Sequence, residues 1–114
     1  PIGNNVQKAI QILDYMGIKP SHYDMRFVKP IDVELLHEIV IDHKYIITVE
    51  DGVKMGGFGS AISEFLFEHN YTNRLKIIGI PDVIIEHGSI DMLYKECGLD
   101  VDSLVEAIKL VWNE

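Results

Sequence analysis

The sequence predicts a three-layer open α/β sandwich built on a mostly parallel sheet. Two observations favour this fold class. Segments with helically spaced apolar residues alternate with short apolar segments, and residues 45–49, Tyr-Ile-Ile-Thr-Val, lack the polar alternation of a one-sided strand. Such a strand is covered on both faces, as in parallel sheets whose strands are joined by right-handed crossovers. The 114 residues suffice for one hydrophobic core, so we expect a single domain over residues 1–114.

A helix is expected at the start of the chain. Apolar residues recur at helical spacing from Val6 to Met16. Asn4 or Asn5 can cap its start, and Gly17 can end its last turn in a left-handed conformation. A doubly wound unit ordinarily begins with a strand, so we expect the first strand to be missing and the chain to be a fragment of a longer polypeptide. A vacant sheet position is a template for association, so we also expect a non-native dimer or a rearranged sheet.

A strand-to-helix step follows this first helix. Residues His22–Val28 are expected to form a strand that Pro30 stops. Asp32 can cap the next helix. The apolar residues of that helix are Leu35, Leu36, Ile39 and Val40.

The second half of the chain continues the alternation after the strand at 45–49. A helix is expected around 61–66 and a strand at 75–80. A further helix should stop at Gly98, and Asp100 or Asp102 can cap the last helix.

The composition is that of an ordinary globular protein, with 47% hydrophobic and 25% charged residues. Ten Lys and Arg residues against 18 Asp and Glu residues give a net charge of -8, and no basic run is present, so nucleic acid is not an expected partner. No apolar stretch reaches the roughly 20 residues that span a bilayer, so no membrane partner is expected. The single Cys97 cannot form an internal disulfide, which is consistent with a cytoplasmic protein.

The most conspicuous motif joins a strand end, a glycine-rich loop and a helix start. It runs from Glu50 to Ser60 and includes Gly56, Gly57 and Gly59. Free N–H groups at such a helix start can hold a phosphate or a carboxylate. However, the glycines match neither common nucleotide-binding pattern, and Glu50 would repel an anion. We therefore favour a tight turn packed closely against another surface, with a freestanding module that binds a small anion as the alternative.

Charged side chains follow each predicted strand. Arg26 and Lys29 follow the first strand, Glu50 the next and Asp82 the last, with His87 in the turn beyond. Because parallel strands end at one edge of a sheet, we expect a contact surface at this carboxyl edge. No two of the five histidines have the i, i+4 spacing of a helical zinc pair, and no nucleophile has an activating neighbour. No catalytic, cofactor-binding or metal-binding residue is assigned.

Long motifs carry a resemblance to a known family. Residues 24–32, Asp-Met-Arg-Phe-Val-Lys-Pro-Ile-Asp, and residues 47–51 followed by 56–60 resemble the C-terminal domain of the transketolase superfamily. Further segments are similar to the 1-deoxy-D-xylulose-5-phosphate synthase family, and the resemblance covers essentially the whole chain. These segments are Ile78–Asp82, Glu86–Ser89 and Glu96–Asp100.

The resemblance implies a role within a larger enzyme. Members of that synthase family use thiamine diphosphate and Mg²⁺ to condense pyruvate with D-glyceraldehyde 3-phosphate with loss of CO₂, for isoprenoid, thiamine and pyridoxal precursor synthesis. The preceding domains hold the cofactor and the metal, so this domain is expected to bind neither, to be inactive alone, to pack against those domains and to support a homodimer. Another enzyme of the superfamily, a transketolase or a 2-oxoacid dehydrogenase beta subunit, is the alternative. The residues expected at the packing surface are Arg26, Lys29, Glu50, Gly56, Gly57, Gly59, Asp82 and His87.

Overall fold

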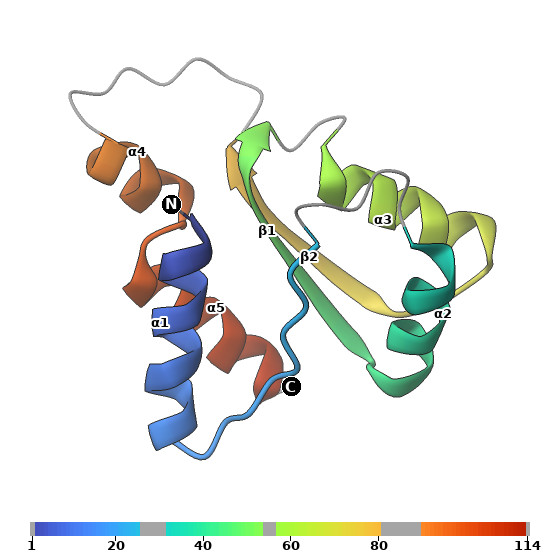
Figure 1. Ribbon diagram of the computed structural model, residues 1–114, viewed down its shortest axis with the longest axis horizontal. Coiled ribbons are helices and arrows are strands. Elements are labelled where there is room, and N and C mark those ends of the chain that lie inside the picture. The colour runs from blue at the N-terminus through green and yellow to red at the C-terminus, as the bar shows by residue number, and fades with distance from the viewer. Residues whose placement is uncertain (1, 26–31, 54–56, 81–89, 114) are drawn as a thin grey trace.

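The computed structural model describes residues 2–25, 32–53, 57–80 and 90–113, and for residues 51–53 and 90–91 the backbone alone. Five helices and two strands lie in these residues, as Figure 1 shows. In chain order they are α1 (Ile2–Tyr15), α2 (Val33–Asp42), β1 (Tyr45–Val53), α3 (Phe58–Glu68), β2 (Arg74–Ile80), α4 (Ile90–Cys97) and α5 (Val101–Trp112).

The two strands form a parallel pair that crosses over through α3. Tyr45 lies opposite Arg74, and the register continues to Val49 opposite Ile78 before it shifts near Val53. This pairing confirms the predicted parallel sheet at both strands. In the part of the chain that the structure describes, the sheet consists of these two strands, so the other edge of β1 is without a paired strand there. The expected association through this edge stays a prediction.

Helices cover both faces of the sheet, which confirms the three-layer arrangement (Figure 1). On one face, α1, α4 and α5 pack around the buried Leu13, Leu99 and Leu104, with Ile47 of β1 packed against them. On the other face, α2 and α3 enclose a second apolar cluster. That cluster consists of Leu36, Val40, Ile62, Phe65 and Leu66, with Ile46 and Leu75 of the sheet packed against it.

Most of the residues predicted to begin or end a helix do so in the structure. The carboxylate of Asp32 accepts a hydrogen bond from Leu35 N at 3.1 Å and caps α2. Asp100 caps α5 in the same way, accepting from Ser103 N at 3.4 Å. Gly17 and Gly98 have positive φ values of 78° and 76° after α1 and α4, the left-handed conformation that commonly ends a helix.

The predicted cap of the first helix is wrong, because α1 begins at Ile2 and both Asn4 and Asn5 lie within it. Asn5 Nδ2 instead donates to the carbonyl oxygen of Leu99 at 3.0 Å. This hydrogen bond joins α1 to the turn between α4 and α5. The asparagine side chain therefore has a tertiary partner.

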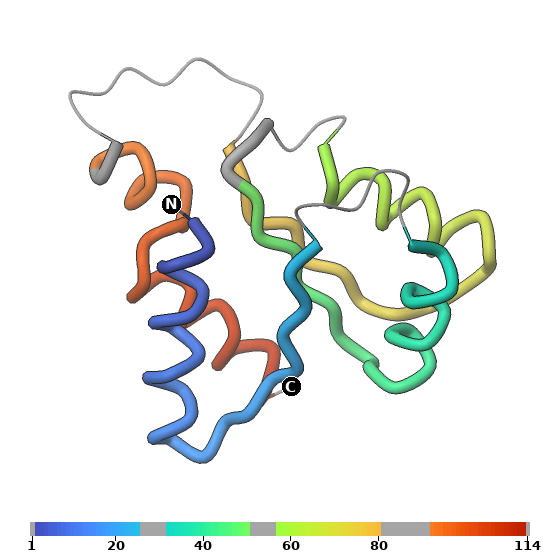
Figure 2. Tube along the Cα trace, viewed as in Figure 1, coloured from blue at the N-terminus to red at the C-terminus, as the bar shows by residue number. Residues whose placement is uncertain are grey.

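The strand predicted at His22–Val28 is also wrong over residues 22–25, which are irregular, while residues 26–28 lie outside the described residues. Ser21 Oγ lies 3.1 Å from His43 Nε2, and the Tyr23 ring packs edge-on against the His43 imidazole at 6.3 Å. Side-chain contacts to the end of α2 thus hold this segment, whereas a strand requires a neighbouring strand for its backbone groups. Figure 2 traces the segment from the α1 layer toward the α2 layer.

Candidate packing surface at the carboxyl edge of the sheet

The structure places three of the eight predicted surface residues. Glu50 lies on β1, Gly57 is the N-cap of α3 and Gly59 lies in its first turn. They meet where β1 ends and α3 begins, at the carboxyl edge of the sheet. The other five lie outside the described residues; these are Arg26, Lys29, Gly56, Asp82 and His87.

Glu50 supplies the cap that α3 lacks at its own N-cap position. Gly57 has no side chain to accept a hydrogen bond, and the Oε2 atom of Glu50 accepts one from Gly59 N at 3.1 Å. A carboxylate at a helix N-terminus satisfies a free N–H group and is stabilised by the positive end of the helix dipole. Glu50 therefore fastens the start of α3 to the strand.

Gly59 allows α3 to approach the sheet closely. A Cβ atom at this position would lie 2.6 Å from Ile77 Cγ2 and 2.8 Å from Thr48 Oγ1. Both neighbours are β-branched residues in strands, with stiff χ1 angles that leave little room to adjust. The glycine is thus required by contact between helix and sheet, which fits the close-packing interpretation of the motif better than the anion-binding one.

The same geometry disfavours an anion site at the start of α3. An incoming phosphate or carboxylate would have to compete with the Glu50 carboxylate for the N–H group of Gly59. The two negative charges would also repel one another at this short distance. The geometry therefore favours a close contact between α3 and the sheet over an anion site, and packing of this edge against another domain stays a prediction.

Two buried oxygens near this edge have no hydrogen-bond partner among the described residues. They are Thr48 Oγ1 and Glu50 Oε1. A buried acceptor without a donor costs roughly 1–3 kcal/mol. Both oxygens are therefore covered within the chain itself, and Thr48 Oγ1 lies beneath Gly59 in the contact between α3 and the sheet. The continuous apolar character of residues 45–49 gave no indication that Thr48 would be buried without a partner.

Three of the four histidines in the described residues, His37, His43 and His69, have structural contacts. His37 Nδ1 lies 2.6 Å from the Tyr71 hydroxyl, and its ring packs edge-on against that of His69 at 4.8 Å. His69 Nδ1 donates to the carbonyl of Phe65 at 2.9 Å. Only the i, i+4 spacing of Phe65 and His69 could have indicated this cluster. Within the described residues, no three His, Cys, Asp or Glu side chains are placed to hold a metal ion.

Replacing Glu50 should test its capping role. Glu50→Ala removes the acceptor of the Gly59 N–H, so we expect the free energy of unfolding to fall by about 1–2 kcal/mol. Glu50→Gln keeps an acceptor and should lose about half of that amount. Urea denaturation monitored by circular dichroism measures the stability of both variants. The control is Glu64→Ala, an exposed glutamate within α3, the helix that Glu50 caps. Equal stability of Glu50→Ala and Glu64→Ala would contradict the capping role.

Comparison with known proteins decides the family. Residues 2–104 match the family described as the transketolase C-terminal domain. The chain belongs to the transketolase C-terminal domain family. No helix among the described residues of this family member is both long enough and apolar enough to cross a membrane.

Curated relatives of this transketolase C-terminal domain are 1-deoxy-D-xylulose-5-phosphate synthases. The synthase of Parabacteroides distasonis is 51% identical over 109 residues, which cover 96% of this chain. The synthase of Cytophaga hutchinsonii is 50% identical over 95% of the chain, and that of Porphyromonas gingivalis is 49% identical over 92%. The chain spans only 17% of the length of each of these enzymes.

A solved structure shares the fold of this transketolase C-terminal domain. It is described as a split gene transketolase, inactive beta4 tetramer, and is 30% identical with a TM-score of 0.78. The match covers 95% of this chain and 34% of that chain. The arrangement of α1 to α5 around the parallel pair is therefore that of a transketolase fold.

Proposed function

We propose that this chain is the C-terminal domain of a 1-deoxy-D-xylulose-5-phosphate synthase acting in the cytoplasm. The whole enzyme would condense pyruvate with D-glyceraldehyde 3-phosphate, releasing CO₂ and giving the precursor of isoprenoids, thiamine and pyridoxal phosphate. The observation that carries the proposal is the 44–51% identity to seven such synthases over 92–96% of the chain.

Thiamine diphosphate and Mg²⁺ would be held by other domains of that polypeptide. The described residues do not fit either group. Glu50 already occupies the N–H group of Gly59 at the start of α3, where a diphosphate would otherwise find donors. Mg²⁺ is usually bound by one or two carboxylates together with phosphate oxygens, so a surface that does not hold the diphosphate offers the metal only part of its ligands. No three His, Cys, Asp or Glu side chains of the described residues are grouped to supply the rest.

The role of this domain would be to pack against the preceding thiamine-diphosphate-binding domains and to support a homodimer. The packing surface would be the carboxyl edge, with Glu50, Gly57 and Gly59 at its centre. The chain spans only 17% of the length of its relatives, which supports this proposal because each of those enzymes contains further polypeptide that such a surface could contact. The adjoining residues of the surface would be Arg26, Lys29, Gly56, Asp82 and His87.

An assay of product formation tests the proposed reaction. The longer polypeptide that contains this chain should form 1-deoxy-D-xylulose 5-phosphate from pyruvate and D-glyceraldehyde 3-phosphate when thiamine diphosphate and Mg²⁺ are present. The 114-residue chain alone should form none, because on this proposal other domains of the polypeptide hold the cofactor. An inactive longer polypeptide, or an active isolated chain, would contradict the proposal.

A different enzyme of the superfamily is the second candidate, favoured by the fold match to a split gene transketolase. The same assay separates the two, because a transketolase would transfer a two-carbon unit between sugar phosphates without releasing CO₂. Transfer between sugar phosphates with no use of pyruvate would support the second candidate. The higher identity to the synthases favours the first.

A further inference from the structure

A groove lies at the opposite end of the strands from the carboxyl edge. It has a volume of about 310 Å³ and runs between the first residues of β1 and β2 and the last turns of α5. We call it the amino-end groove. The side chains that line it include those of Tyr45, Arg74, Lys76, Ala107, Leu110 and Val111.

The amino-end groove is basic although the chain is acidic. The chain has a net charge of -8, yet Arg74 and Lys76 line the groove, and no Asp or Glu does so among the described residues. Lys44 Nζ lies 5.3 Å from the centre of the Tyr45 ring, and Arg74 Cζ lies 5.4 Å from it. Two cations therefore flank the Tyr45 ring, and Lys76 lines the same groove, which together create a local positive potential.

The opposite wall of the groove is apolar and open to solvent. Leu110 is 67% exposed, and it lines the groove together with Ala107 and Val111. Covering apolar surface of this kind contributes about 25 cal/mol per Å². A ligand with an apolar body would gain from this wall, and its charged group would gain from Lys76.

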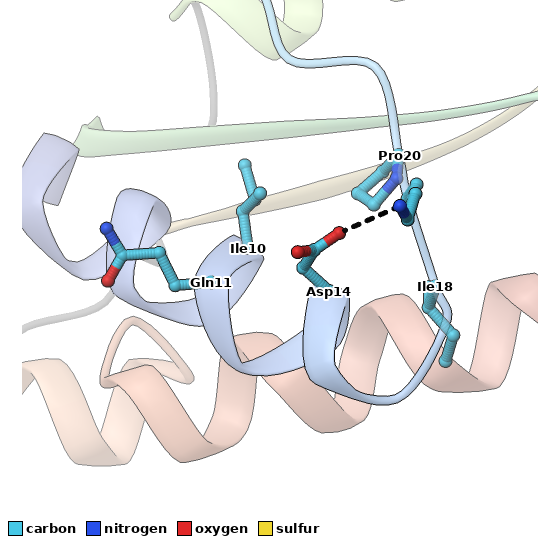
Figure 3. A pocket seen from close by; sticks show the side chains of 6 residues that line it. Ile10, Gln11, Asp14, Ile18 and Pro20 are labelled. Atoms are coloured by element: carbon cyan, nitrogen blue, oxygen red, sulfur yellow. Dashed lines mark ion pairs between the residues drawn. The ribbon is translucent and has the colours of Figure 1, made fainter.

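A second hollow of similar size lacks this charge. It has a volume of about 300 Å³ and lies beside the turn that follows α1. Its cation, Lys19, pairs with Asp14 at 3.5 Å, as the dashed line in Figure 3 shows. Because the two charges offset one another, this hollow would not attract an anion, whereas Lys76 lines the amino-end groove, which makes that groove the stronger candidate.

We propose that the amino-end groove binds a small organic carboxylate with an aromatic or branched apolar body. The carboxylate contacts Lys76 and the Tyr45 hydroxyl, with Arg74 adding positive charge, and the apolar body covers Leu110. A volume of about 310 Å³ is at the lower end of the range of small-molecule sites, about 300–1,000 Å³. The site is separate from the carboxyl edge, since β1 runs from Tyr45 at the groove to Val53.

Titration of the 114-residue chain with benzoate, followed by amide NMR, tests this site. The amides of Tyr45, Lys76 and Leu110 should shift to saturation with a dissociation constant on the order of 1 mM. Lys76→Gln should weaken binding about 5-fold or more, and Lys76→Arg should keep most of the affinity. Exposed Lys8→Gln on α1 is the matched control and should have no effect.

Two other probes separate charge from apolar contact. Benzamide, which has the same shape without the charge, and inorganic phosphate, which has charge without an apolar body, should each bind at least about 5-fold more weakly than benzoate. Leu110→Gln should weaken benzoate binding without altering the fold, because this side chain is largely exposed. Non-saturating shifts, equal binding of benzamide, or benzoate binding unchanged by Lys76→Gln would overturn the proposal.

Discussion

Replacing Gly59 with alanine is expected to lower the free energy of unfolding by about 2–3 kcal/mol. The new methyl group would lie within 3 Å of Ile77 and Thr48, in positions that real Cβ atoms essentially never occupy. Alanine ordinarily stabilises a helix by up to about 1 kcal/mol relative to glycine, so the steric cost must exceed that gain. The clash should also move α3 away from the sheet and weaken the Glu50 cap.

Gly3→Ala is the matched control for this prediction. Gly3 and Gly59 are each the second residue of their helix, but among the described residues a Cβ built on Gly3 meets no atom within 4 Å beyond its chain neighbours and its own helix backbone. Gly3→Ala should therefore be neutral or slightly stabilising. Thermal unfolding followed by circular dichroism compares the two variants. A Gly59→Ala variant as stable as Gly3→Ala would show that α3 is not held as closely to the sheet as described.

Leu104→Ala is expected to cost about 2–5 kcal/mol of stability. Leu104 is 1% exposed and lies in the apolar cluster between α1, α5 and the sheet. Truncation removes buried methyl groups and leaves a cavity that the surrounding helices fill only in part. The loss should approach a large fraction of the total stability of a domain of this size, so the variant should unfold at a clearly lower urea concentration.

Leu110→Ala in the same helix provides the control for Leu104. Its side chain is 67% exposed, so truncation should change stability by no more than about 0.5 kcal/mol. The urea midpoints of the two variants measure the difference between them. Similar midpoints would contradict the assignment of this α5 face to the core.

Local sequence patterns correctly predicted those strands and helix caps that depend on residues close together in the sequence. The apolar run at 45–49 predicted a strand covered on both sides. Asp32 was predicted as a helix cap, and Asp100 was one of two candidates with Asp102, because a cap depends on residues three positions away. The failures are tertiary in origin. Asn4 or Asn5 was expected to cap α1, but the partner of Asn5 is Leu99, 94 positions away in the sequence.

The carboxyl edge was predictable only in part. The glycine-rich motif indicated a close contact, yet nothing local showed that Thr48 and Ile77 would be the neighbours of Gly59. Similarly, the acidity of Glu50 was expected to repel anions, but its hydrogen bond to Gly59 N depends on how α3 lies over the end of β1. The amino-end groove combines residues from three elements, so no single segment could indicate it.

We propose that this domain works by binding to the domains that precede it. The most direct measurement titrates the 114-residue chain into the longer polypeptide from which these residues have been removed, using calorimetry and the synthase assay together. The account predicts saturable binding and recovery of 1-deoxy-D-xylulose 5-phosphate formation, with both weakened by Gly59→Ala. A truncated polypeptide that is fully active without the chain and does not bind it would contradict the claim.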